Sequence, residues 1–407
     1  MWRSIKSSHS KQTEYFEAMM RRVVDNEAYR QQAEKLIDTV ARTEPLFAES
    51  LLTPQSPSYH GEGPFLRDHL QSMLAALFAI TQGDIHLLEA EELRRLKGFE
   101  EEILEVEETI REHAALFEVF ILVHDIGKWA SVFFTADSGS RGEQAGLTMK
   151  LSDRFSKEGL VEQAKIRRRY LETYKEFCRQ HAQESPQVQQ IFFAKTYGVK
   201  AHYSGHEHLI YAPVYRALLE RLASTRRLSD RDLALLEDLI AHHMQPVRGY
   251  RKEVVPSRIE ISLGVAKAGG YDADDFLDLQ QAGLFLDLPC GSCAYCQGHY
   301  HRDLDTFIHF LQSEHAYAPW KREEKQRVRE EQEKRANNVL FQQVGLDGVA
   351  LMDLLGLPPG PAFGKILREI QASILGEELM PRFSREVKEE LDRRMSRFYQ
   401  LKLTKEF

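Results

Sequence analysis

Residues 114–128 read AALFEVFILVHDIGK, and this stretch decides the fold class and the chemistry of the chain. An apolar run ends in His124 and Asp125, and Lys128 follows within one helical turn. Burying such polar groups without partners costs about 2–7 kcal/mol for a neutral group and more for a charged one. A divalent cation that bonds both side chains removes this cost. The stretch therefore predicts a buried helix that ends at a metal site.

The remainder of the chain is also typical of helices. Apolar residues recur at helical spacing, as in Leu66, Met73 and Leu77, and alternating, strand-like runs are scarce. Ser229 and Ser384 each precede such a segment, as the N-cap residues of helices do. We expect an all-α protein.

The composition is that of a soluble globular protein. The 407 residues are 43% hydrophobic and 29% charged. No apolar run is long enough to span a bilayer, and the first residues lack an apolar signal core, so we expect a cytoplasmic protein with no membrane partner. The net charge of −8 argues against a general polyanion binder, and no DNA partner is expected. The oligomeric state stays open.

Changes in composition divide the chain into four parts. Residues 321–335 (KREEKQRVREEQEKR) mix both charge signs at helical spacing, which indicates a solvated helix. The predicted parts are an N-terminal helical extension (1–55), a metal-binding helical domain (56–318), a charged helical linker (319–338) and a C-terminal helical domain (339–407).

Candidate metal ligands occur at five places along the chain. His202 and His206 are four residues apart, so on a helix they would share a face. Imidazoles suit transition metals, and a carboxylate adds charge and can bridge two ions. The predicted ligands are His69, His124, Asp125, His206, His242, His243 and Asp287.

The predicted chemistry is phosphate hydrolysis through a metal-activated water. Two cations about 4 Å apart can support in-line attack at phosphorus. Asp125 and Lys128 are the predicted catalytic residues, and Lys128 would neutralise charge on the phosphoryl group. The ligands outside the doublet at 124–125 are less specific, which leaves competing assignments open: His60, His202, His208 and Asp278. The side chains expected to support the ligands or contact substrate are His60, Glu62, His202 and Glu207.

The order of these ligands, together with the HDIGK phrase, resembles the HD superfamily of metal-dependent phosphohydrolases over about residues 59–288. The resemblance implies an all-helical bundle. It implies one metal held by His69, His124, Asp125 and Asp287. A second metal would be held by His206 and by His242 or His243, with Asp125 shared. The implied cofactors are one or two divalent metals from among Mn, Fe, Ni, Zn and Mg.

Within that superfamily, the chain is most similar to the HD and C-terminal regions of bacterial tRNA nucleotidyltransferases (CCA-adding enzymes) and poly(A) polymerases. The similar segments are 59–63 (YHGEG), 205–207 (GHE), 241–244 (AHHM), 346–348 (LDG), 357–361 (LPPGP) and 364–367 (GKIL). The nucleotidyltransferase head of those enzymes has no counterpart before residue 59. The family tail contacts tRNA, so the resemblance implies an RNA end as a partner.

The tail has a physical reading of its own. Pro-Gly-Pro should end one helix, and a new helix should open at Gly364 with free backbone N–H groups, which suit phosphate. The predicted phosphate- or RNA-binding residues are Gly360, Gly364 and Lys365. The alternative is a plain connection between helices.

Residues 290–301 (CGSCAYCQGHYH) form a Cys/His cluster directly after Asp287. Three thiols and one imidazole at equal gaps can close around one tetrahedral ion, so we predict a structural zinc that fixes this loop. An iron–sulfur cluster and a loop without metal are the alternatives. The predicted zinc ligands are Cys290, Cys293, Cys296 and His299.

These observations predict a metal-dependent phosphohydrolase or phosphodiesterase that acts on a nucleotide or an RNA terminus. Two other functions stay open. One is a non-catalytic RNA-binding adaptor, and the other is a hydrolase of signalling nucleotides without any RNA partner.

Overall fold

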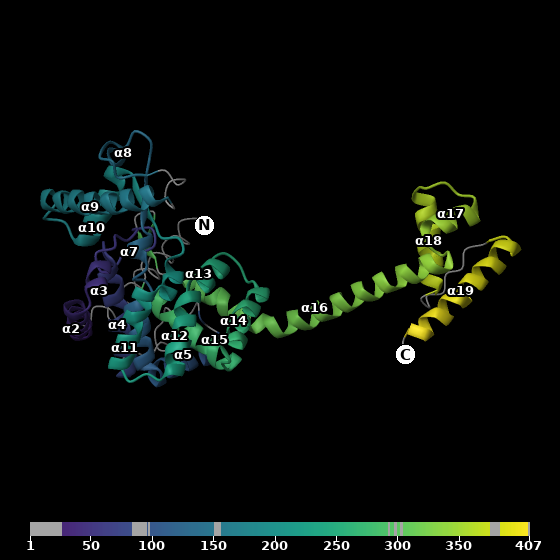
Figure 1. The fold of residues 1–407 in the computed structure, drawn as a ribbon, viewed down its shortest axis with the longest axis horizontal. Coiled ribbons are helices and arrows are strands. Elements are labelled where there is room, and N and C mark those ends of the chain that lie inside the picture. Colours follow the sequence, from purple (N-terminus) through teal and green to yellow (C-terminus); the bar gives the residue numbers. More distant parts are fainter. Residues whose placement is uncertain are drawn as a thin grey trace, which may run out of the picture. The chain divides into compact units, whose positions relative to one another are not determined.

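The fold is all-α in the computed structural model of the chain, as the apolar spacing predicts (Figure 1). The structure describes residues 27–83, 96, 98–149, 156–291, 294–296, 299–301, 304–374 and 383–405. The described strands are four, in two short antiparallel pairs. The chain divides into two compact units, Met1–Tyr317 and Ala318–Phe407. None of the described helices has the length and apolarity to cross a membrane.

The first unit contains the candidate site. Its longer helices in chain order are α2 (Glu27–Thr43), α4 (Leu66–Thr81), α5 (Glu100–Glu112), α6 (Ala114–Val123), α9 (Lys157–Gln180), α10 (Pro186–Tyr197), α11 (Pro213–Thr225), α12 (Asp230–His242), α14 (Ile259–Gly269) and α15 (Ala273–Phe285). Shorter helical segments are α3 (Pro45–Ser50), α7 (Lys128–Ser131), α8 (Arg141–Gln144), η4 (His206–Tyr211), α13 (Met244–Tyr250), η5 (Pro256–Arg258) and η6 (Leu286–Cys290).

Helices α4, α6 and α15 form the centre of the main core. Helix α6 is apolar around most of its circumference, and a helix of this kind is stable only when neighbours cover every side. Helices α4, α5, α11 and α12 contact it. Phe117 and Ile121 of α6 are fully buried. The end of α6 therefore delivers its polar residues into the protein interior.

Helix α2 belongs to the same core, so the predicted boundary at residue 55 does not separate two units. Tyr29, Ala33, Ile37 and Val40 of α2 are buried, and their spacing of three or four residues forms one apolar stripe. Helix α2 packs against α4 through this stripe. The sequence predicts a separate extension here because α4, the helix that covers this apolar stripe, lies further along the chain.

Between Asp125 and His206, the chain forms a small subdomain with its own apolar core. Strands β1 (Phe133–Ala136) and β2 (Val199–His202) pair antiparallel, with Phe133 opposite His202. Helices α9 and α10 pack beside them. The rings of this second core belong to Phe134, Tyr170, Tyr174, Phe177 and Phe193. We call residues 132–202 the inserted subdomain.

Both predicted helix starts are confirmed. The Ser229 hydroxyl accepts from the N–H of Asp232, and the Asp232 carboxylate accepts in return from the Ser229 N–H, so α12 opens with a capping box. Ser384 accepts from the Val387 N–H at the start of α19 (Arg385–Lys405).

The second unit is a small helical assembly. Helix α16 (Leu304–Val344) begins in the first unit, where Phe307, Phe310 and Leu311 belong to the main core, and continues from Ala318 in the second unit. It includes the predicted linker 319–338, so that segment is helical throughout. Helices α17 (Gly348–Leu355), α18 (Pro361–Ile374) and α19 follow. The core of this unit is formed by Phe341, Leu351, Phe363 and Phe398 with their neighbours.

Candidate metal centre

The candidate site begins where α6 ends. The N–H of His124 still donates to Phe120, so His124 continues the last turn of α6. The rings of Phe120 and His124 stack with their centroids 5.1 Å apart. His124 and Asp125 are 1% and 2% exposed. The apolar helix thus holds an imidazole and a carboxylate in the interior, as its sequence predicts.

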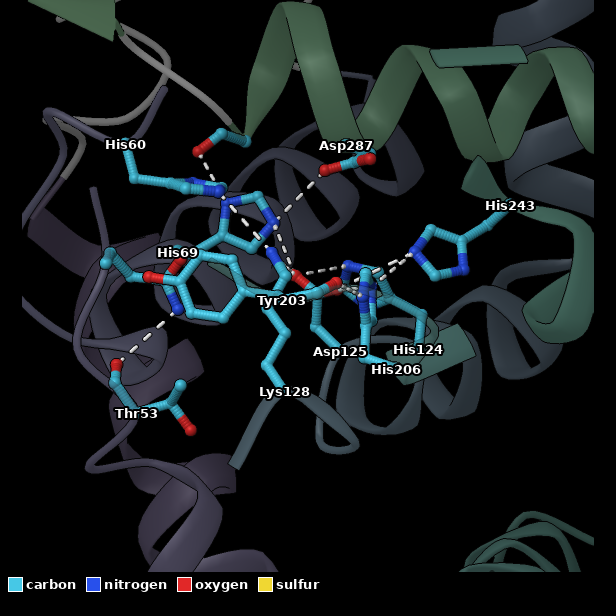
Figure 2. A network of polar contacts seen from close by, with 12 residues as sticks. Thr53, His60, His69, His124, Asp125, Lys128, Tyr203, His206, His243 and Asp287 are labelled. Carbon is cyan, nitrogen blue, oxygen red and sulfur yellow. Dashed lines mark hydrogen bonds and ion pairs between the residues drawn. The ribbon is translucent and has the colours of Figure 1, made fainter. Parts of the chain in front are cut away.

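A first group of ligand atoms comes from three separate elements. His69 of α4, His124 and Asp287 of η6 offer ligand atoms that all lie within 4.8 Å of one another (Figure 2). His69 Nε2 lies 3.1 Å from Asp287 Oδ1. Asp287 sits in a π-helical turn that contains Pro289, directly after α15. Such turns re-aim side chains and are frequent at functional sites.

A second group lies on the other side of Asp125. It consists of Asp125, His206 at the start of η4 and His243 at the end of α12. Asp125 Oδ1 is 2.9 Å from His206 Nε2 and 3.6 Å from His243 Nε2. All three residues are buried.

Asp125 joins the two groups through its two oxygen atoms. Oδ1 faces His206 and His243, as given above. Oδ2 lies 3.5 Å from His124 Nε2 and 3.8 Å from His69 Nε2. A carboxylate with one oxygen toward each of two groups is the arrangement that bridges two cations.

The other nitrogen of each histidine fixes which atom faces the centre. His124, His206 and His243 direct Nδ1 to the backbone oxygens of Ile121, Tyr203 and Ile240, at 3.1, 2.9 and 2.6 Å. A neutral ring that donates from Nδ1 has its lone pair on Nε2. Every Nε2 of these three rings is thereby prepared as a metal ligand.

The polar atoms at the centre fit a cation better than they fit one another. His69 Nε2, His124 Nε2 and Asp125 Oδ1 are buried without a hydrogen bond of acceptable geometry. Yet His69 Nε2 lies 3.1 Å from Asp287 Oδ1, and Asp125 Oδ1 lies 2.9 Å from His206 Nε2. Ligands about 2.1 Å from one ion lie roughly 3–3.5 Å apart and point at the ion. The residues present therefore fit a divalent transition metal.

The electrostatics favour positive charge at the centre. Burial opposes ionisation of Asp125, but the charge of Lys128 holds the pKa of its carboxyl well below the usual value. Burial lowers the pKa of His124 to about 3, which keeps this ring neutral. Burial also disfavours the His69 cation, but Asp287 and Glu62 raise the pKa of His69 to about 10. Burial by itself would raise the pKa of Asp287, but the hydrogen bond and charge of His69 lower it.

Lys128 lies inside this centre. Its Nζ is 2.5 Å from Asp125 Oδ2 and 3.4 Å from His60 Nε2. The ammonium also faces the ring of Tyr203, 5.3 Å from the ring centroid. The side chains of Lys128, His60 and Asp287 are 8%, 10% and 12% exposed, slightly more than those of the other residues around Asp125.

Gly127 of the HDIGK phrase makes room for His206. A Cβ atom at Gly127 would lie 2.3 Å from the backbone oxygen of His206, a distance that no real contact shows. The backbone of Gly127 itself has ordinary helical angles, so the requirement is space. The glycine lets η4 approach the end of α6 and so brings the second group to Asp125.

Several of the predicted site residues lie outside the two ligand groups. The expectation that His202 and His206 share a helix face is wrong, because His202 ends β2 and Gly205 turns the chain at a φ of +77° before η4. His202 contacts Thr135 and stacks on Phe133.

Neighbours in sequence point in different directions. His242 is half-buried and directs Nδ1 to Asp238 O, so His243 alone of this pair joins the second group. His208 is exposed, and Glu207 pairs with Arg248 while lying 3.4 Å from His206 Nδ1. Asp278, on α15, is in none of the ligand groups found among the described residues.

Part of the Cys/His cluster, including Cys293, lies outside the described residues. Cys290 is buried in η6. Strands β3 (Ala294–Cys296) and β4 (His299–His301) form a hairpin in which Cys296 is opposite His299. The zinc site stays a prediction.

The phosphate cradle expected in the tail is corrected. Helix α18 opens at Pro361, three residues earlier than predicted, and the Gly364 N–H already donates to Gly360 O at 2.9 Å. Proline is well suited to a first helical position, which explains the early start. Lys365 is exposed.

Sequence reasoning missed the residues that hold the site in place. Gln187 and Gln190 of α10 contact the backbone around His60, and Tyr203 donates to Pro54 O. Polar residues on a short helix carry no signal of such a role. Comparisons of the chain with protein-family models, curated proteins and solved structures found no match.

Proposed function

We propose that the protein is a metal-dependent phosphohydrolase or phosphodiesterase of the HD type, acting on a nucleotide or an RNA terminus. The observation that supports this most is the sharing of Asp125 by two buried ligand groups. Its Oδ1 faces His206 and its Oδ2 faces His124, at 2.9 and 3.5 Å. When bound, two divalent cations there would supply Lewis-acid stabilisation of phosphate oxygens and lower the pKa of water.

The chain's own groups support phosphate rather than another substrate. Lys128 Nζ lies 2.5 Å from Asp125 Oδ2 at the centre, where it can pair with a phosphoryl oxygen as a point charge. His60 lies next to it, 3.4 Å away. Both groups are held in place before substrate arrives, because Asp125 and Glu62 already fix them. A lysine ammonium beside a carboxylate-bridged centre is suited to a phosphate ester.

The test is hydrolysis of bis(p-nitrophenyl) phosphate, with metal content measured on the same samples. Asp125→Ala should lose both bound ions and the hydrolysis. Asp278→Asn is the matched control, because this acid is on α15 and outside the ligand groups. Activity that persists in Asp125→Ala after the metal is gone would overturn the proposal. If hydrolysis is lost together with the metal, a screen of small phosphoesters and RNA ends would identify the substrate.

A further inference from the structure

One acidic side chain near the centre has a geometry that the ligand groups do not use. Glu62 lies in the loop before α4 and is 6% exposed at its side chain. Its Oε1 is 2.8 Å from His60 Nδ1 and 3.0 Å from His69 Nδ1. One carboxylate oxygen thus contacts two imidazoles, on the side of His69 that faces away from Asp125.

His60, Glu62 and His69 could be read as a third ion site, since their ligand atoms lie close together. The orientation of His69 argues against this. Its Nε2 faces Asp287 and Asp125, at 3.1 and 3.8 Å. If Nε2 is the ligand atom, the single proton of the neutral ring must be on Nδ1. Nδ1 is then a donor to Glu62 and cannot hold a further ion.

We propose that Glu62 is a positioning residue, which orients His69 for the first metal and is itself held by the inserted subdomain. A carboxylate behind a metal-bound imidazole fixes the ring and increases its basicity. The inference rests on the proposed metal centre. Its new content is that residues of α10, far from His69 in the sequence, determine how strongly one of the two ions binds.

Two glutamines of α10 carry the second half of this inference. Gln190 is 3% exposed, and its Nε2 donates to His60 O at 3.1 Å and to Gln55 O at 3.0 Å. Gln187 Nε2 donates to Glu62 O at 3.2 Å. The loop that carries Glu62 is therefore bonded to α10 at three backbone oxygens.

A second hydrogen-bond acceptor near His69 limits the loss of metal affinity that we expect when Glu62 is replaced. His69 Nδ1 is also 3.0 Å from the backbone oxygen of Gly291, so the tautomer of His69 persists when Glu62 is removed. Loss of Glu62 should therefore weaken one ion without abolishing the site. Losing such a supporting group typically weakens metal affinity by about 10–100-fold.

The experiment is titration of the full chain with Co²⁺, followed by calorimetry and by visible absorption. Glu62→Ala should weaken one of the two ions about 10–100-fold and leave the other unchanged. Glu62→Gln keeps an oxygen at the same place and should recover part of the loss. Gln190→Ala should weaken the same ion. Gln189→Ala should not, because Gln189 Nε2 donates to His181 O and not to the loop that carries Glu62.

The outcomes separate the two proposals. Two ions of unchanged affinity in Glu62→Ala and in Gln190→Ala would overturn this inference alone. Equal weakening of both ions would also overturn it, since it would indicate general loss of structure. A wild-type protein that binds no Co²⁺ outside the Cys/His cluster would overturn the metal centre and this inference with it.

Discussion

The Nε2 atoms of His206 and His243 lie 3.3 Å apart in the interior of the first unit. Each ring directs Nδ1 to a backbone oxygen, so in the neutral rings both facing nitrogens carry lone pairs. Two lone pairs at this separation repel unless a cation lies between them. A cation bound between the two rings would remove this repulsion.

Replacing His243 should remove one ion, and replacing its neighbour should not. His243→Ala deletes a ligand atom of the second group, and we expect that ion to bind more than about 100-fold more weakly. His242→Ala is the matched control, because His242 faces Asp238 O and not the centre. Metal analysis after dialysis measures both. Equal metal loss in the two variants would contradict the assignment.

Lys128→Met should separate metal binding from catalysis. The ammonium lies 2.5 Å from Asp125 Oδ2 and competes for an oxygen that a cation would use. We therefore expect metal affinity to be unchanged or higher in Lys128→Met, while phosphodiester hydrolysis falls about 10²-fold or more through loss of a charged group at the phosphate. Lower metal affinity in this variant would indicate that Lys128 supports the ligands instead.

Gly127→Ala should destabilise the first unit and weaken the second ion. The added methyl group would lie 2.3 Å from the His206 backbone oxygen, so η4 must move away from Asp125. We expect a loss of about 1–3 kcal/mol in the free energy of unfolding, as for other overpacked sites. Urea denaturation measures it.

Gly264→Ala is the control for Gly127→Ala. Gly264 is exposed on α14, and a Cβ atom there meets nothing within 4 Å. Alanine should raise the free energy of unfolding by roughly 0.5–1 kcal/mol, because glycine is unfavourable inside a helix. A similar loss in both variants would indicate that the contact with His206 is not the cause.

Glu314 should make the protein less stable as the pH rises. Burial, together with the charges of Asp278 and Glu102, raises the pKa of Glu314 to about 7. The folded state then binds more protons than the unfolded state between about pH 4.5 and 7, so the free energy of unfolding falls with pH across that window. Glu314→Gln should be more stable than wild type at pH 8, on the order of 1–3 kcal/mol, and nearly equal at pH 4. Thermal denaturation at the two pH values measures the difference, and a stability gap independent of pH would exclude this cause.

The sequence contained enough to predict the helical class and the doublet at the end of α6. An apolar run followed by His124 and Asp125 has few physical alternatives, because both polar groups are buried with the helix that carries them. The choice between His242 and His243 depended on the rotation of the last turn of α12, which spacing alone does not determine. The same holds for Asp287, whose direction depends on the π-helical turn around Pro289.

Other features depend on contacts between distant parts of the chain and left no local trace. The approach of η4 to Gly127 needs the antiparallel pairing of β1 and β2, and the sequence pattern there predicts no strands. Gln190 is an ordinary polar residue until α10 packs over the loop at His60. The start of α18 at Pro361 was missed because Pro-Gly-Pro was read as a break, whereas its last proline opens the helix.

Asp125 is one planar group with an oxygen toward each ligand group, so a rotation of this carboxylate would act on both groups at once. A substitution that turns the carboxylate to suit a larger ion in one half moves the other oxygen away from its own histidines. If the centre holds two ions as proposed, a change that acts through Asp125 should alter the binding of both, whereas a change behind a single histidine should alter one.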